Sequence, residues 1–158
     1  MIRSENLRIL LLGLGMVLIQ VVLFRNLQIF GAEADLILVY ILWMCTSRSK
    51  TESLLFAALF GLLQDGMTDL WGLNMFSKTL MVFILHGYLN RISENRFIFW
   101  QIFLIVFGAA FFHNLVFLGV SFFTETYATS YVFWSLLFLS SFFTAVLGSF
   151  LHLVRDQS

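Results

Sequence analysis

The chain has 158 residues, of which 60% are hydrophobic and only 11% are charged, and its mean hydropathy is +0.93. An ordinary soluble domain carries about a quarter charged residues, so this composition excludes one. The formal net charge is zero and there is no basic or acidic tail, which excludes the charge pattern of a nucleic-acid-binding protein. We therefore expect an all-α integral membrane protein with lipid around it.

Six apolar segments follow one another along the chain, and a helix needs about 20 residues to cross a bilayer, or fewer where the bilayer thins. Short polar connections separate the segments, so the sequence predicts one six-helix transmembrane domain over residues 1–158. The predicted helices cover residues 7–24, 34–46, 53–70, 75–89, 97–123 and 131–154. The N-terminus has a basic start, as a signal peptide does, but the long apolar run that follows and the lack of an A-x-A-like site predict a retained first helix.

The basic residues predict the orientation, because Lys and Arg accumulate in cytoplasmic loops. Alternate helix ends carry seven basic residues on one side and two on the other. The larger set is Arg3, Arg8, Arg48, Lys50, Arg91, Arg96 and Arg155, and the smaller set is Arg25 and Lys78. This asymmetry places both termini in the cytoplasm and requires an even number of spans.

Small residues recur at four-residue spacing, which lets helices approach closely in lipid. The sixth segment has Ser140, Thr144 and Gly148 in such a series. In the third segment, Ala57 and Gly61 begin a series that continues with two acids, Asp65 and Asp69. Residues four apart share one helix face, so we expect both acids to point into protein.

The two acids are functional candidates, because an ionised group inside a bilayer is costly and needs a partner. The nearest cation is Lys78, across a tight connection, and we expect it to pair with Asp65. Two arrangements avoid repulsion between the acids. Either Asp69 reaches the headgroup region, or one acid is protonated or paired. A polar clamp that fixes the hairpin is favoured over a catalytic or transport role.

Other polar residues inside the apolar segments predict hydrogen bonds between helices. They are Gln20, His86, His113 and Asn114. The histidines lie on separate helices and none has a second histidine three or four residues away, so we expect no metal, and we expect no cofactor. The motifs of nucleophilic or phosphate-binding enzymes are missing from the sequence. We therefore name no catalytic residue and expect a protein that is not an enzyme.

Two stretches of this sequence, LIQVVLFRNLQIFGAEADLILVYILW and FGLLQDGMTDLWGLNMFSKTLMVFILHGYL, resemble the MreD family of bacterial rod shape-determining membrane proteins. The most specific element is a glycine, three residues, an acid, six residues and a glycine, which falls on Gly61, Asp65 and Gly72. Gln20 near the end of the first helix also matches. Members often have a proline where this chain has Ala34.

The resemblance implies a six-helix inner-membrane protein with cytoplasmic termini and a fold like that of the membrane substrate-binding subunits of energy-coupling-factor transporters. It further implies a non-catalytic scaffold that binds MreC within the cell-wall elongation machinery, together with RodA and its penicillin-binding transpeptidase. Such a scaffold contributes to rod-shape maintenance and to the regulation of peptidoglycan synthesis. In this interpretation Gly61 gives close packing, Gly72 a tight turn and Asp65 a polar clamp.

Two alternatives stay open. The first is a subunit that binds a small ligand or a lipid intermediate in a central polar cavity. That cavity would be lined by Asp65, Asp69, Lys78, His86, His113 and Asn114. The second, which we rank last, is an enzyme of lipid-linked precursors. A polar cavity in the bundle favours the ligand-binding alternative, whereas a centre filled with Phe and Leu favours the scaffold.

Overall fold

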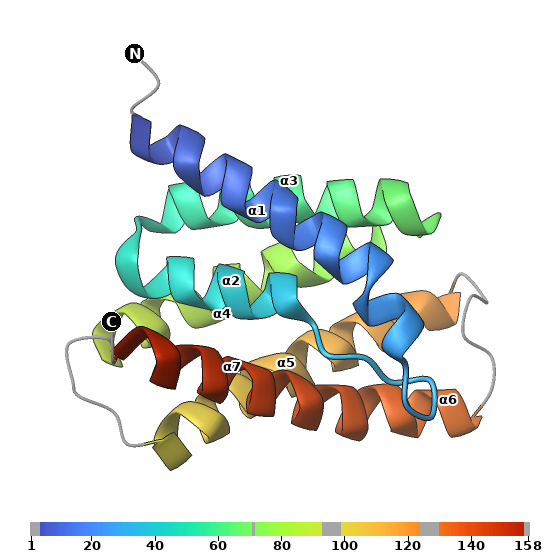
Figure 1. Ribbon diagram of the computed structural model, residues 1–158. Helices are drawn as coiled ribbons and strands as arrows, with labels where there is room; N and C mark the ends of the chain where they lie inside the picture. Colours follow the sequence, from blue (N-terminus) through green and yellow to red (C-terminus); the bar gives the residue numbers. More distant parts are fainter. Residues whose placement is uncertain (1–3, 71, 93–98, 124–129, 157–158) are drawn as a thin grey trace.

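The computed structural model describes residues 4–70, 72–92, 99–123 and 130–156, and this part of the chain is all-helical, as expected. The elements are α1 (Ser4–Val22), the 3-10 helix η1 (Phe24–Leu27), α2 (Leu36–Ser47), α3 (Lys50–Thr68), α4 (Leu73–Ile92), α5 (Phe99–Phe123), α6 (Ser130–Trp134) and α7 (Ser141–Asp156). A π-helical stretch, η2 (Ser135–Ser140), joins α6 to α7 without a break. The helices lie side by side in an elongated bundle (Figure 1).

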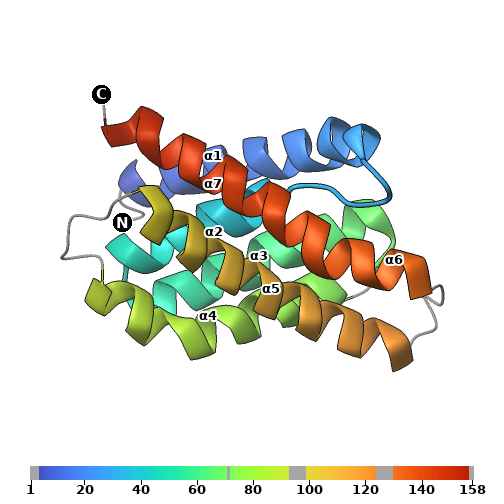
Figure 2. The ribbon, with the colours of Figure 1, turned by 90° about the horizontal axis from the view of Figure 1, so that it is seen from below.

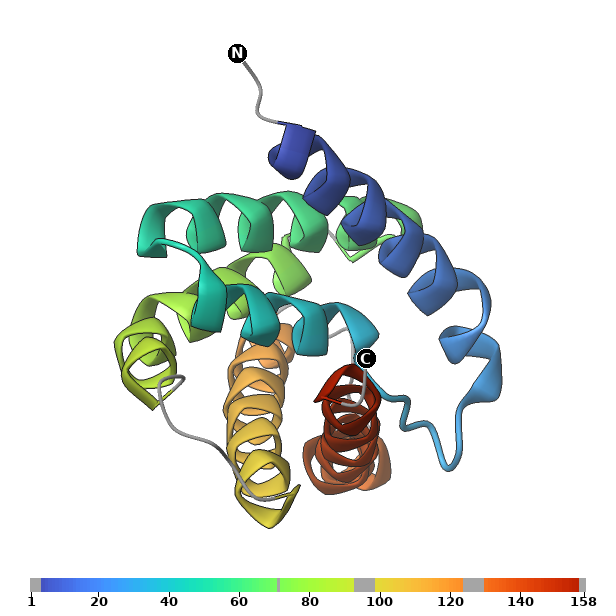
Figure 3. The same cartoon turned by 60° about the vertical axis from the view of Figure 1, so that its left-hand side comes forward.

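Helix α2 lies at the centre of the bundle, where it packs against α1, α3, α4, α5 and α7 (Figure 3). Eight of its 12 residues are buried. The core around it includes Ile37, Leu38 and Ile41 from α2 and Phe60 from α3. Because α2 is apolar on nearly every side, its sequence lacks the one-sided pattern of a surface helix.

Three helical stretches are long and apolar enough to cross a membrane, namely Glu5–Leu27, Phe99–Phe123 and Val132–Val154. Helix α2 is also apolar, but its 12 residues extend only about 18 Å, against about 30 Å of hydrocarbon. Helices α3 and α4 are less apolar because they carry many of the buried polar residues, among them Asp65 and Lys78.

The start of α1, the α2–α3 turn and the end of α7 lie at one end of the bundle, which we call the terminal end (Figures 1 and 2). The other end, which we call the distal end, holds η1, the end of α3, the start of α4 and α6. Arg48 and Lys50 flank the turn at the terminal end, and Arg91 lies in the last turn of α4. Arg3 and Arg96 lie outside the described residues.

The predicted small-residue faces lie in helix contacts. A methyl group added at Gly61 would lie 2.6 Å from the Met75 Cα atom, so α3 and α4 approach backbone to backbone at this glycine. A methyl group at Gly148 would lie 3.0 Å from a side-chain methyl of Val106 on α5. Thr144, four residues before Gly148, is completely buried.

Candidate functional site

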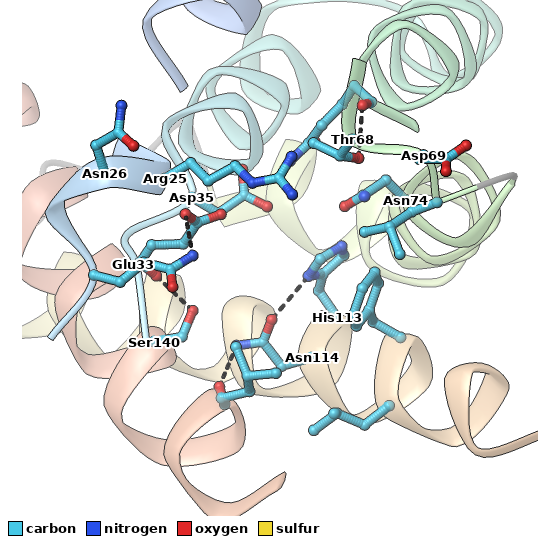
Figure 4. Close-up of a pocket in the computed structure, with 16 residues that line it drawn as sticks. Arg25, Asn26, Glu33, Asp35, Thr68, Asp69, Asn74, His113, Asn114 and Ser140 are labelled. Carbon is cyan, nitrogen blue, oxygen red and sulfur yellow. Dashed lines mark hydrogen bonds between the residues drawn. The ribbon is translucent and has the colours of Figure 1, made fainter. Parts of the chain in front are cut away.

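A polar cleft with a volume of about 730 Å³ lies at the distal end of the bundle (Figure 4). Its walls come from η1, the stretch that leads into α2, the end of α3, the start of α4, α5 and η2. The lining residues are Arg25, Asn26, Gln28, Glu33, Asp35, Gln64, Thr68, Asp69, Leu70, Asn74, His113, Asn114, Phe117, Leu118, Leu136 and Ser140. Of the six residues predicted to line a central cavity, Asp69, His113 and Asn114 do so.

Burial separates the rim of the cleft from its floor. The exposed residues Arg25, Asn26, Gln28 and Asp69 form the rim. The floor consists of buried residues from several helices, namely Asp35, Gln64, Asn74, His113, Asn114, Leu118 and Ser140. Polar groups therefore line the cleft from its exposed rim to its buried floor.

Asp35, on the floor of the cleft, forms a buried ion pair with Lys78, which lies behind it. The Lys78 Nζ atom lies 2.7 Å from Asp35 Oδ2 and donates a second hydrogen bond of 3.0 Å to Asn74 Oδ1. The Lys78 side chain is 0% exposed. The predicted pairing of Lys78 with Asp65 is therefore wrong, because the carboxylate that precedes α2 reaches the ammonium instead.

Asp65 caps the start of α4. Its Oδ1 atom accepts hydrogen bonds of 2.9 Å from the backbone N–H and the side-chain amide of Asn74, and its Oδ2 atom accepts one of 2.9 Å from the Met75 N–H. The first N–H groups of a helix have no partner within the helix, so the carboxylate satisfies them. Gly72, with φ of +86°, makes the turn between the two helices. Asp65 is thus a clamp, but to backbone rather than to Lys78.

Asp69 lies elsewhere than the sequence predicted. It is exposed at the rim and ends α3 with φ of +60°, so its side chain leaves the four-residue series of Ala57, Gly61 and Asp65. The left-handed backbone that ends the helix turns Asp69 away from the face on which Asp65 is buried. This placement matches the alternative in which Asp69 reaches outward while Asp65 stays inside.

His113 and Asn114 link three helical elements below the cleft. His113 Nε2 lies 3.1 Å from the Ser77 hydroxyl of α4, and His113 Nδ1 lies 3.2 Å from Asn114 Oδ1. The Asn114 amide donates hydrogen bonds of 3.0 Å to the Leu136 carbonyl of η2 and to the Ser141 hydroxyl. Since the amide NH₂ faces those two acceptors, Asn114 Oδ1 faces the imidazole. Both residues therefore make the interhelical contacts expected from sequence.

The start of α2 is held in the same network. Gln20 of α1 accepts a 2.7 Å hydrogen bond from the Leu36 N–H and donates one of 2.9 Å to the Ala34 carbonyl. The Asp35 N–H donates a 2.9 Å bond to the Thr144 hydroxyl of α7. Non-helical backbone between η1 and α2 is thus satisfied by neighbouring helices, as burial requires.

His86 takes no part in the cleft. It lies at the terminal end, where its Nε2 atom is 3.0 Å from the Arg48 carbonyl at the end of α2. Asp65 and Lys78 also do not line the cleft, although Asn74 connects both to its floor. Within the described residues, no group of three or more His, Cys, Asp or Glu side chains is placed to hold a metal ion.

Two lining groups make no hydrogen bond within the described part of the chain. The Arg25 side chain extends from η1 toward the cleft (Figure 4), and its guanidinium makes no ion pair there. The buried Gln64 Oε1 atom has no hydrogen-bond partner. Between rim and floor, burial raises the pKa of the half-buried Glu33 carboxyl, against the effect of its hydrogen bond from Gln28.

Sequence reasoning missed several residues of the cleft. Gln64 directly precedes Asp65, and Asn74 lies four residues before Lys78, a helical spacing that indicates contact. Both signals were present in the sequence. Glu33 and Arg25 lie in a connection without helical periodicity, so no pattern indicated that they approach the other helices.

Comparison of this chain with protein-family models, with curated proteins and with solved structures finds no match.

Proposed function

We propose that this chain is a six-span inner-membrane protein of bacteria that acts as a non-catalytic scaffold of the MreD type. In this role it binds MreC within the cell-wall elongation machinery that contains RodA and its penicillin-binding transpeptidase. The observation that carries the proposal is the joint role of Gly61, Asp65 and Gly72, which form the family-like pattern. They lie close together in sequence, and together they fix the α3–α4 hairpin.

The arrangement of the helices supports six spans. The start of α1 and the end of α7 lie at the same end of the bundle (Figure 2). Helix α2 is short, but the stretch before it lies against other helices and lines the polar cleft. Non-helical backbone at membrane depth is tolerated in such places.

The distribution of basic residues supports the same orientation. Because Lys78 is buried, it no longer counts as a loop charge, and the two sides then carry seven basic residues against Arg25 alone.

A tight turn at the distal end supplies a surface for MreC. Ile29 and Ala32 exchange two backbone hydrogen bonds of 3.0 Å, and Phe30 between them has φ of +54°. Leu27, Ile29 and Phe30 are exposed by 69%, 53% and 69%. A positive φ is uncommon for a bulky residue other than glycine, and strained backbone is maintained mainly where it serves a function. We assign this turn to the contact with the periplasmic side of MreC.

Co-purification from membranes with a candidate MreC tests the proposal. We expect the two proteins to be recovered together in mild detergent. Phe30→Asn removes the apolar side chain while keeping a residue that tolerates positive φ, so it reduces the amount of MreC recovered. Thr51→Asn, an exposed position at the terminal end, leaves the amount unchanged. Recovery of this chain without MreC in every condition would overturn the proposal.

The cleft favours a second candidate function, the binding of a small ligand. A polar cavity was the feature that separates this alternative from a simple scaffold, and a polar cleft is present. Its volume of about 730 Å³ lies within the range of about 300–1,000 Å³ that is typical of ligand sites. Both functions are compatible in one protein, because the MreC surface and the cleft involve different residues.

A further inference from the structure

The cleft contains one hydrogen-bond donor group and one acceptor atom that have no partner among the described residues. Arg25 is a cation with several N–H donors and no acceptor among the described residues. Gln64 is 6% exposed, and its Oε1 atom is an acceptor without a donor. A buried polar atom without a partner is uncommon and costs free energy. A ligand that supplies an anionic group to Arg25 and an N–H donor to Gln64 satisfies both.

The remaining polar groups of the floor are already engaged. Asp35 accepts from Lys78 and from the Leu38 N–H, and Asn74 accepts from Lys78 while donating to Asp65. The ion pair neutralises Asp35, so its charge is not available to a ligand. The ligand must therefore be recognised mainly by the unpaired groups and by the charged residues nearer the rim.

The charges of the lining favour a cation beside the anion. With Asp35 neutralised by Lys78, the other ionisable lining residues are the cation Arg25, the two acids Glu33 and Asp69, and the imidazole of His113, which is already hydrogen-bonded to Ser77 and Asn114. These two acids give the cleft an excess of negative charge that stabilises a bound ammonium. Arg25, as a planar donor, suits a phosphate or carboxylate.

One part of the lining is apolar. Leu70, Phe117, Leu118 and Leu136 contribute this part, and Phe117 stacks on His113 with ring centroids 6.2 Å apart. Such a wall suits a short hydrocarbon linker between two charged groups.

We propose that the cleft binds a small zwitterion in which a short carbon chain joins a primary ammonium to a phosphate or carboxylate. In this arrangement Arg25 contacts the anion, and Gln64 Oε1 accepts a hydrogen bond from the ammonium.

This inference rests on the second candidate function and is independent of MreC. Two kinds of molecule join a primary ammonium to an anion in this way, namely an ethanolamine phospholipid headgroup and a free amino acid. Two probe pairs distinguish them, each differing only in N-methylation. One pair is phosphatidylethanolamine and phosphatidylcholine, mixed equally in nanodiscs and measured by native mass spectrometry of retained lipid. The other pair is glycine and its trimethylated form, betaine, titrated into the protein in phosphatidylcholine nanodiscs.

In one of the two pairs, we expect the protein to bind the primary amine about tenfold more tightly than the trimethylated form. This difference corresponds to one hydrogen bond to a charged group. The pair that shows it identifies the source. Gln64→Met, which removes the acceptor at similar size, abolishes this preference. A residue with only a structural role would not change the selectivity between two ligands.

Arg25→Gln weakens binding of the amine probe by about tenfold or more, because a charge-assisted contact to the anion is lost. The matched control is Arg91→Gln, an exposed arginine at the terminal end, which leaves binding unchanged. Equal binding of amine and trimethylamine in both pairs would overturn the inference, as would equal effects of the two arginine substitutions. The assay uses the chain alone, so its failure leaves the co-purification with MreC as a separate result.

Discussion

At the distal end of the bundle, the ion pair between Asp35 and Lys78 is buried and joins two helices, whereas the ion pair at the terminal end is partly exposed. Lys78 is fully buried against Asp35. At the terminal end, Arg48 forms an ion pair with Glu5, whose side chain is 65% exposed. A buried charge must keep its partner, while an exposed one is solvated by water or lipid headgroups. The buried Asp35–Lys78 pair therefore helps to determine the packing of the helices, whereas the exposed Arg48–Glu5 pair contributes little to it.

The same contrast holds for α2, whose two ends lie in these two regions. Its start is fixed by Gln20, Thr144 and the Asp35–Lys78 pair, so three other helices contact it through polar groups. Its end is bonded to His86 of α4. Substitutions at the start should therefore destabilise the protein more than substitutions at the end. The free energy of unfolding of each variant, measured by reversible denaturation in mixed micelles, should show this difference.

The largest expected effect is that of Lys78→Met. Removal of the ammonium leaves Asp35 buried without its cation, which costs about 3–5 kcal/mol. In the double variant, Asp35→Asn removes the unpaired negative charge and keeps a residue that caps helix starts well. The double variant should regain more than half of the lost stability. If the double variant is less stable than Lys78→Met, Asp35 is not the principal partner.

Gly61→Ala should have the next largest effect. The new methyl group would lie 2.6 Å from Met75 Cα, and backbone atoms cannot move aside as a side chain does. Overpacking of this kind costs about 1–3 kcal/mol. Gly66→Ala, in the same helix with no atom within 4 Å of the new methyl group, is the matched control and should not destabilise. A loss of the same size in both variants would contradict the close contact at Gly61.

Asp65→Asn is expected to cost about 1–2 kcal/mol, because the amide NH₂ would face a backbone donor of α4. The substitution keeps the shape of the side chain, so the loss reports hydrogen bonding at the helix start. Hydrogen exchange should show faster opening at the Asn74 and Met75 amides, which donate to the carboxylate. Unchanged exchange at these amides would mean that Asp65 is not the cap of α4.

Glu5→Gln at the terminal end should have the smallest effect, at most about 1 kcal/mol, because exposed ion pairs contribute little. Its partner Arg48 is retained and remains solvated. Added salt should diminish the difference between variant and parent further. A loss comparable to that of Lys78→Met would remove the distinction between the two ends.

Local features of this fold could be predicted from sequence. Gly61 and Gly72 occupy a close helix contact and a turn with positive φ, because four-residue spacing and a glycine beyond a helix are local signals. The face of Ser140, Thr144 and Gly148 is buried for the same reason. These properties depend on residues within a few helical turns of one another.

The partner of Lys78 and the cleft could not be predicted in this way. Asp35 is 43 residues from Lys78, and it reaches the ammonium only because α2 lies at the centre of the bundle. Asp65 is nearer in sequence, but its oxygens are engaged by the backbone of α4. The cleft depends likewise on where the stretch before α2 lies relative to α5 and η2, which no local pattern encodes.

Cysteine accessibility across the membrane tests the central claim most directly, namely that the two ends of the bundle face opposite sides of it. The buried Cys45 is first replaced by alanine, and a new cysteine is then placed at Asn26 on the cleft rim or at Thr51 beside the α2–α3 turn. In intact spheroplasts, an impermeable maleimide should label the cysteine at 26 and should label the one at 51 only after permeabilisation. Equal labelling of both from outside, or labelling of 51 alone, would contradict the account.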